Sequence, residues 1–207
     1  ARLLEQGWQP PGGYLLGFSD VTSLLWAQQA AGIRGAIHGP LVTTLAMEPA
    51  WSQQRLRGLL QGDAPEPLQG TGWGGGQSCG PLLAGNLTVA THLLGSQHCP
   101  ELEGAILLIE DVGEAPYRID RLLTHWRLCG ALQQLAGIGL GSFEGCERAS
   151  DEERPGFSLE QVLRERTSDL GIPVVADLPF GHGAENAALS LGSKVVLDGA
   201  SGLFTAA

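Results

Sequence analysis

The chain has 207 residues, of which 43% are hydrophobic and 16% are charged. This length and composition are enough to bury a real core, which excludes a disordered chain. The formal net charge of -10 excludes the basic face that binding to nucleic acid or to an anionic membrane would require. We therefore expect a soluble, acidic globular protein.

The cysteines and glycines exclude further classes of protein. The four cysteines form no close pair of the kind that zinc sites use, so we expect free, buried or half-buried thiols and no metal. The 31 glycines follow no triplet period and indicate many tight turns. No apolar run reaches the ~18 residues of a membrane span, and no signal peptide is visible. Residues 1–7 are typical of a helix end with a glycine cap and lack an initiator methionine, so we expect the natural N-terminus to lie upstream.

The first predicted elements form a βαβ unit. Residues 14–18 form a short apolar run after a Pro-Pro-Gly-Gly turn and predict a buried strand. Residues 20–31 have apolar positions at helical spacing, and residues 35–38 predict a second strand. A strand, a helix and a strand in so short a span indicate a parallel sheet.

A polar helix over residues 48–61 follows, and a Gly- and Pro-rich break comes after it. We place a domain boundary within residues 62–72, which divides the chain into parts 1–66 and 67–207.

The second part alternates strands and helices. Strands are predicted at 105–109, 138–140 and 173–177, with closing strands at 194–197 and 202–204. Helices are predicted at 115–130 and 158–169, and Ser158 with Gln161 fits a capping box at the start of the second one.

Ser19 lies between the first strand and the first helix, in the run Gly-Phe-Ser-Asp-Val. A serine in such a turn is typical of a nucleophile elbow, although the usual second glycine is replaced by Val21. The backbone N–H of Asp20, at the new helix N-terminus, is then a candidate oxyanion donor. The alternative is that Ser19 only caps the helix.

A serine nucleophile needs a base and an acid that orients it. Of the five histidines, His38 and His182 follow strand ends next to glycines, where sites gather in parallel sheets. Either one also fits an ordinary turn histidine. Glu110 directly follows five apolar residues, while Asp111 and Glu114 fit solvated loop positions.

Five motifs in order carry a family resemblance. They are Gly-Phe-Ser-Asp-Val-Thr (17–22), His-Gly-Pro (38–40), Gly-Asn-Leu-Thr (85–88), the run from Glu110 to Arg121, and Phe-Gly-His-Gly (180–183). Each motif alone is weak, but together they span nearly the whole chain. The chain resembles the LD-carboxypeptidase (muramoyltetrapeptide carboxypeptidase) family of serine peptidases, which includes the microcin C immunity peptidases.

The resemblance implies an α/β fold with two parts. The first is a partial parallel-sheet N-terminal domain of the class I glutamine amidotransferase type, and the second is a C-terminal swivelling β/α domain. It also implies a Ser-Glu-His triad of Ser19, Glu110 and His182, with Glu114 as the fallback acid. His38 and Asn86 match motifs that line the cleft and are expected to contact substrate.

By the same resemblance, the substrate is a murein tetrapeptide, cleaved at the L,D-amide bond to its terminal D-alanine during cytoplasmic recycling of the cell wall. The resemblance implies that the protein needs no cofactor or metal and that it forms a homodimer. Members of the family carry an earlier segment with a glycine-rich turn near the oxyanion site, and this chain begins just after that point. The alternatives are a hydrolase of the same fold that acts on a peptidyl or aminoacyl nucleotide, and a non-catalytic binding module.

Overall fold

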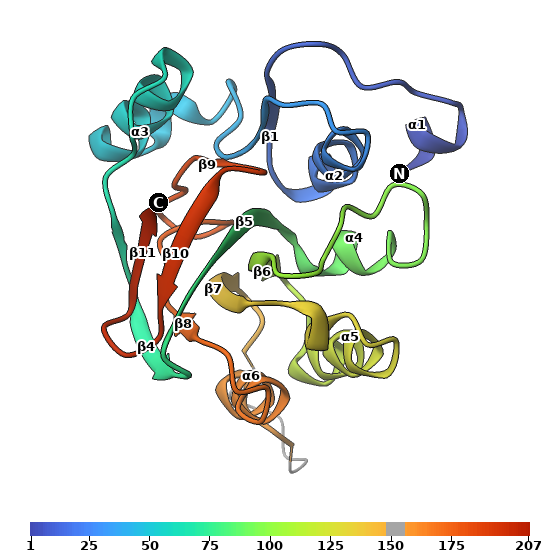
Figure 1. Cartoon of the computed structure of the whole chain (residues 1–207), viewed down its shortest axis with the longest axis vertical. Helices are drawn as coiled ribbons and strands as arrows, with labels where there is room; N and C mark the ends of the chain where they lie inside the picture. Colours follow the sequence, from blue (N-terminus) through green and yellow to red (C-terminus); the bar gives the residue numbers. More distant parts are fainter. Residues whose placement is uncertain (148–155) are drawn as a thin grey trace.

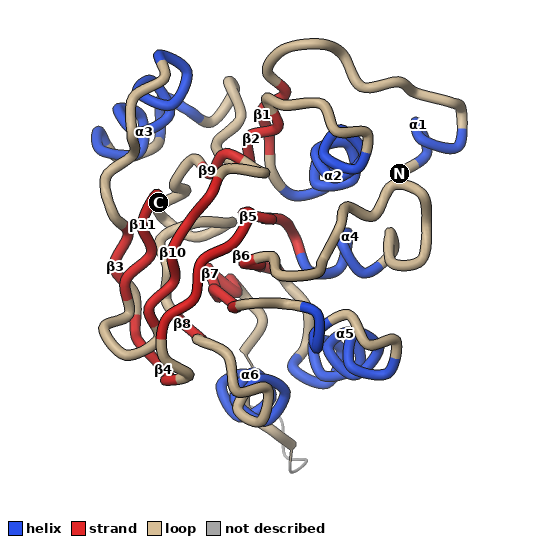
Figure 2. The backbone as a smooth tube through the Cα atoms, in the orientation of Figure 1, coloured by secondary structure: helices blue, strands red, loops and turns tan. Residues whose placement is uncertain are grey.

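The computed structural model describes residues 1–147 and 156–207 (Figure 1). The helices are α1 (Arg2–Glu5), α2 (Thr22–Ala30), α3 (Ala50–Gln61), α4 (Leu87–Thr91), α5 (Pro116–Leu128) and α6 (Leu159–Thr167), with 3-10 turns η1 (Ser19–Val21), η2 (Leu45–Met47) and η3 (Leu132–Gln134). The strands are β1 (Leu15–Gly17), β2 (Ala36–His38), β3 (Leu68–Gln69), β4 (Thr71–Gly74), β5 (Gln77–Asn86), β6 (Ile106–Val112), β7 (Gly137–Glu144), β8 (Val174–Ala176), β9 (Leu189–Ser190), β10 (Lys194–Asp198) and β11 (Leu203–Ala206). These strands form two sheets (Figure 2), so the α/β class is confirmed.

The smaller sheet contains the predicted βαβ unit. Strands β1 and β2 are parallel, with Gly17 opposite His38, and α2 connects them. The third strand, β9, comes from near the end of the chain and pairs antiparallel with β2. The segment after His182 therefore returns to the sheet that leads into Ser19.

The larger sheet has the order β3-β11-β10-β5-β6-β7-β8-β4. Strands β5, β6, β7 and β8 are parallel to one another, and the remaining pairs, toward either end of the order, are antiparallel. The two end strands, β3 and β4, are joined by Gly70 alone, so the ends of the sheet meet. A side chain at Gly70 would bring a Cβ within 2.3 Å of the Ala176 carbonyl oxygen, which explains why a glycine stands there.

The predicted helices at 48–61, 115–130 and 158–169 are confirmed as α3, α5 and α6, and the Ser158–Gln161 capping box is present. The strand predicted at 105–109 continues to residue 112, so Glu110 lies within β6, opposite Asn86, and not beyond its end. Strands β3 and β4 lie in the stretch that the sequence marked as an interruption, and β5 begins directly after it, at Gln77. Their residues have low strand propensity, and tertiary pairing with β8, β10 and β11 decides their conformation.

Helices α4, α5 and α6 lie along one side of the larger sheet (Figure 1). The smaller sheet lies with α2 and α3 at the end of the molecule opposite α6. Trp26 of α2 is fully buried, and its indole nitrogen donates to the Ala84 carbonyl of β5 at 3.0 Å. Its ring meets that of Trp126 from α5 edge-on, with centroids 6.2 Å apart. One cluster of buried apolar side chains therefore includes residues from both sides of the predicted boundary. The division into parts 1–66 and 67–207 stays a prediction.

The four cysteines are free thiols, as expected. Their burial was only partly predicted. Cys146 is buried and Cys99 is half-buried, but Cys79 and Cys129 are exposed. Cys79 lies on β5 and Cys129 at the end of α5, at positions that face away from the core.

Candidate active site

Ser19 lies in the sharp turn that joins β1 to α2. Its φ of +58° is in the left-handed region, where a residue other than glycine costs about 1–3 kcal/mol. The helix-capping alternative is not what the structure has, because Phe18 and Val21 occupy the two cap positions and neither makes a side-chain cap bond. Asp20 follows in the first turn of η1, where N-terminal backbone N–H groups lack intrahelical partners. A strained serine between a strand and a helix is the backbone geometry of a nucleophile elbow.

Glu110 and His182 form a hydrogen-bonded pair. His182 Nδ1 lies 2.6 Å from Glu110 Oε2, with the carboxylate fully buried and the imidazole 19% exposed. An ionised carboxylate can only accept, so Nδ1 carries the hydrogen and Nε2 is left as the acceptor. The hydrogen bond that His182 donates to Glu110 raises the pKa of His182 and outweighs the lowering effect of burial. This is the arrangement of an oriented general base.

The loop that carries His182 approaches β6 closely because residue 181 is a glycine. Gly181 has a φ of +109°, and a Cβ there would come within 2.8 Å of Glu110 Cβ and 2.6 Å of Ser142 Oγ. On the other side of His182, the Gly183 N–H donates to Ser142 Oγ at 2.9 Å. The two glycines therefore allow the backbone to lie against β6 and β7 so that the imidazole reaches Glu110.

Aromatic contacts connect the Ser19 turn to this pair. The ring of Phe18, the neighbour of Ser19, lies 4.8 Å from the His182 ring. His38 is fully buried near Phe18 and Phe180, with ring centroids 6.3 and 5.7 Å away. Burial, helped by the charge of His182, lowers the pKa of His38 to about 3, so His38 is neutral at neutral pH. Its two ring nitrogens have no hydrogen-bond partner among the described residues.

Asn86 is held inside the protein. Its amide nitrogen donates to Asp111 Oδ1 at 3.1 Å, and its amide oxygen accepts from the Val89 N–H at 3.0 Å, which caps α4. Asp111 also accepts from the backbone and the hydroxyl of Thr88. The observed role of Asn86 is thus to join β5, α4 and β6, and its expected contact with substrate remains a prediction.

Two carboxylates that sequence reasoning treated as loop residues differ in their roles. Glu114, the fallback acid, pairs with Arg118 at 3.3 Å on the protein surface, and it is Glu110 that contacts His182. Asp111 is 2% exposed and organises the start of α4, a role that sequence reasoning missed. The available signal was its position directly after a buried strand, where a charged group needs partners.

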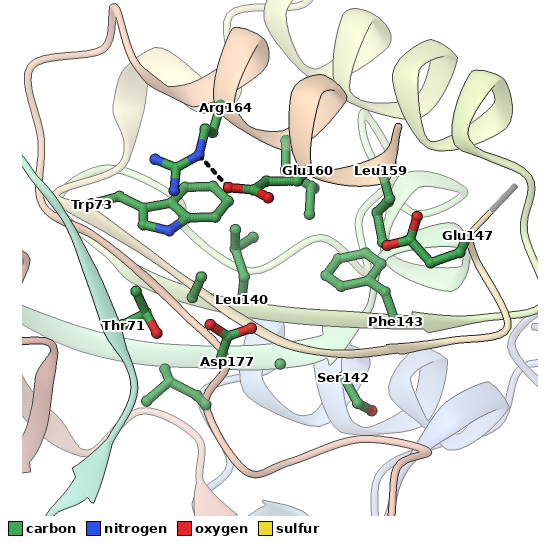
Figure 3. A pocket seen from close by; sticks show the side chains of 14 residues that line it. Thr71, Trp73, Leu140, Ser142, Phe143, Glu147, Leu159, Glu160, Arg164 and Asp177 are labelled. Atoms are coloured by element: carbon green, nitrogen blue, oxygen red, sulfur yellow. Dashed lines mark hydrogen bonds and ion pairs between the residues drawn. The ribbon is translucent and has the colours of Figure 1, made fainter. Parts of the chain in front are cut away.

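A cavity of about 470 Å³ lies between α6 and the strands β4, β7 and β8 (Figure 3). Its polar lining includes Ser142, Asp177 and the ion pair of Arg164 with Glu160, in which Nε and Oε1 are 2.7 Å apart. The Arg164 guanidinium also lies 4.0 Å from the centre of the Trp73 ring. Ser19, Glu110 and His182 do not line this cavity, which adjoins the His182 loop through Ser142.

Across residues 1–147 and 156–207, no three His, Cys, Asp or Glu side chains gather closely enough to hold a metal ion. Over the same residues, none of the helices combines the length and the apolar character needed to cross a membrane.

Comparison with known proteins gives consistent matches. The family model of the LD-carboxypeptidase C-terminal domain matches residues 79–197. A Synechocystis sp. protein named as a carboxypeptidase is 54% identical over 206 residues, which are 98% of this chain and 67% of that protein. The murein tetrapeptide carboxypeptidase of Pseudomonas aeruginosa is 38% identical over 201 residues, covering 89% of this chain and 62% of that enzyme. The crystal structure of muramoyltetrapeptide carboxypeptidase from Oxalobacter formigenes matches with a TM-score of 0.81 at 26% identity, covering 98% of this chain and 69% of that one.

A further relative, the microcin C7 self-immunity protein of Escherichia coli, is 32% identical over 127 residues, covering 61% of this chain and 36% of that protein. The chain thus spans about two thirds or less of the length of the relatives it matches. The family model covers more than half of the chain, and the resemblance seen in the five sequence motifs is confirmed. The chain belongs to the LD-carboxypeptidase family.

Proposed function

We propose that the protein containing this chain is a serine-type LD-carboxypeptidase, which removes the terminal D-alanine from murein tetrapeptides with Ser19, Glu110 and His182 as its triad. The observation that carries the proposal is the 2.6 Å contact of Glu110 with His182, with the ring of Phe18, the residue before Ser19, packed on the imidazole. The names of the murein relatives supply the substrate class.

In the first step, Nε2 of His182 accepts the Ser19 hydroxyl proton as Oγ attacks the carbonyl carbon before the D-alanine. The new C–O bond leaves a negative oxygen, which the Asp20 N–H stabilises. The C–N bond then breaks, the proton on His182 passes to the departing amine, and D-alanine leaves. Glu110 remains ionised and holds the imidazole in the tautomer that the step requires.

In the second step, water attacks the acyl-enzyme ester and gives its proton to His182. The ester C–O bond breaks, the proton returns to Ser19, and a tripeptide with a free carboxylate is released. The amide has then been hydrolysed with no net change to the protein. His38 and Asn86 are buried, so in this proposal they support the site from within and would contact substrate only if their side chains moved.

The proposal is tested by D-alanine release from a tetrapeptide, measured on the complete natural protein. We expect Ser19→Ala and His182→Ala each to lower kcat by at least about 10³-fold, because the triad acts as a unit. Ser201→Ala and His125→Ala are matched controls at exposed positions and should retain normal kcat. Activity that survives the Ser19 or His182 substitution would overturn the triad.

The family resemblance leaves one competing substrate class open, a peptidyl or aminoacyl nucleotide, because the family includes the microcin C immunity peptidases and the microcin C7 self-immunity protein is one of the relatives. Both substrates place an amide at the same serine, so the triad variants do not separate them. The ratio of kcat/KM for the tetrapeptide and for an aminoacyl sulfamoyl nucleoside, measured side by side, does. We expect the tetrapeptide to be the preferred substrate. The family resemblance also implies that the protein is cytoplasmic and forms a homodimer. Sedimentation equilibrium tests the dimer.

A further inference from the structure

The loop that carries His182 is hydrogen-bonded to α3, a helix from the first part of the chain. Glu48, just before α3, and three residues within it, Trp51, Ser52 and Arg55, all contact residues 185–188. Within α3, Trp51 and Ser52 lie four and three residues before Arg55, so these three side chains share one helix face, and Glu48 precedes the helix in extended backbone. A single face therefore binds the end of the loop.

Asn186 is at the centre of this contact. Its backbone N–H donates to Glu48 Oε2 at 3.0 Å, and its carbonyl accepts from Ser52 Oγ at 2.7 Å. Ser52 and Asn186 are both buried, with exposed fractions of 0% and 1%. Both backbone groups of Asn186 are thus bonded to side chains of the α3 region.

The side chain of Asn186 points the other way, toward the base. Its Oδ1 accepts from the Gly181 N–H at 3.1 Å, directly before His182. Ser142 holds the Gly183 N–H directly after His182. The backbone on both sides of the imidazole is therefore fixed by side chains, one of which is itself held by Glu48 and Ser52.

Outer contacts support the same attachment. Trp51 Nε1 donates to Glu185 Oε1 at 3.0 Å, and Arg55 Nε donates to the Ala188 carbonyl at 2.9 Å. Below them, Ile37, Leu56 and Ala188 form a small apolar cluster. Since β9 then pairs with β2, the loop is joined to the sheet whose first strand leads into Ser19.

We propose that Glu48, Ser52 and Asn186 form an α3 clamp that sets the position of His182 relative to Ser19, with Glu48 and Asn186 as positioning residues for the hydrolysis. The inference rests on the proposed function, because it assigns the clamp to the base of that reaction. Misplacement of a catalytic group by about 1 Å can lower a rate about 10²-fold. The side chains whose interactions raise the pKa of His182 are Glu110 and Asp111 on β6, so the influence of Glu48 passes through the loop backbone.

The first test separates kcat from KM in the complete natural protein. We expect Glu48→Ala to lower kcat about 10- to 100-fold with less than about a threefold change in KM, because the clamp orients the base and does not bind substrate. Glu48→Gln should recover most of the loss, since its amide oxygen can still accept from the Asn186 N–H. Asp169→Ala, which breaks the ion pair between the turn after α6 and Arg127 of α5, is the control for general destabilisation and should leave kcat unchanged.

The second test needs no substrate. The Nδ1–H proton of His182, in its short hydrogen bond to Glu110, should give a low-field proton NMR signal in the free protein. We expect this signal to weaken or shift in Glu48→Ala, to return in Glu48→Gln and to be unaffected in Asp169→Ala. If Glu48→Ala fails to fold, Ser52→Ala is used in its place. It removes the bond to the Asn186 carbonyl and the 3.3 Å contact of Ser52 Oγ with Glu48 Oε2, keeps the bond of the Asn186 N–H to Glu48, and should show the same changes to a smaller degree.

The outcomes distinguish the two proposals. Unchanged kcat and an unchanged His182 signal in Glu48→Ala, or in Ser52→Ala where the first does not fold, would overturn the clamp. An equal loss in Glu48→Gln and Glu48→Ala would also overturn it. If the wild-type protein releases no D-alanine but its His182 signal responds to Glu48, the proposed function fails while the clamp stands as a device that orients the imidazole.

Discussion

At the scale of single residues, the bond between Glu110 and His182 decides which imidazole nitrogen carries the hydrogen. A glutamine at position 110 can donate its own N–H to Nδ1 and so favour the opposite tautomer, with Nε2 protonated and unable to accept the Ser19 proton. We expect Glu110→Gln to lower kcat about 10³- to 10⁴-fold with little change in fold, measured by D-alanine release and circular dichroism.

The Glu110→Gln variant also tests how kcat/KM depends on pH. The Glu110 hydrogen bond raises the pKa of His182 above its ordinary 6.5, and the base must be neutral to act. The acidic limb of the kcat/KM profile should therefore lie above pH 6.5 in the wild type and move to lower pH in the residual activity of Glu110→Gln. An acidic limb that stays in place would show that another group controls it.

The lowered pKa of His38 should make the unfolding free energy of the protein depend on pH. Its pKa is about 3 in the folded protein against 6.5 when unfolded, so the unfolded chain takes up the proton first as the pH falls. Its contribution to stability is therefore present above pH 6.5 and is lost toward pH 3. Between pH 7.5 and pH 5 we expect the wild type to lose about 2 kcal/mol more of its unfolding free energy than His38→Gln, by urea titration.

His182 acts in the opposite sense. Its raised pKa adds stability that is present below pH 6.5 and is lost as the pH rises through the folded value. Both proteins in the His38 comparison contain His182, so this effect cancels in the difference. Equal losses in the wild type and in His38→Gln would mean that His38 is solvated or hydrogen-bonded in solution.

The sequence was enough to predict a functional role for some of these residues but not for others. Ser19, Glu110 and His182 could be named because each belongs to a motif and the motifs occur in order. The positive φ of Ser19 could not be read from Gly-Phe-Ser-Asp-Val, which fits a helix start equally well. Glu48 and Asn186 belong to no motif with chemistry, and their importance comes from a contact between segments far apart in the chain.

At the scale of elements, hydrophobic spacing predicted those that bury a regular face. Helix α5 and the core of β6 were found in this way, whereas α3 was predicted as a polar helix and α6 was predicted with a capping box at its start. Strand β9 was missed because it is very short and exists by pairing with β2. The structure adds a functional reading to these elements, since α3 and β9 together hold the loop between β8 and β9 on which His182 lies.

At the scale of the whole molecule, glycine and proline content predicted a boundary near residues 62–72, and one buried apolar cluster includes residues from both sides of it. Trp26 lies before that boundary, whereas its hydrogen-bond partner Ala84 and its ring partner Trp126 lie after it. Leu4, Leu25 and Ala36 belong to the same buried cluster as the central strands. A core shared in this way favours unfolding of both parts in one step.

Trp26→Phe tests this shared core. Phenylalanine keeps the aromatic ring but removes the N–H, which leaves the buried Ala84 carbonyl without that donor and lowers the unfolding free energy by about 2 kcal/mol. If the two parts open together, native-state hydrogen exchange should show the same loss of protection for the slowest amides of α2 and of β6. Leu128→Ala, at an 83% exposed position on α5, should change neither. A loss confined to α2 would instead mean that the chain opens as two units on either side of residues 62–72, and the position of Ser19 relative to His182 would then depend on the α3 clamp far more than on the core.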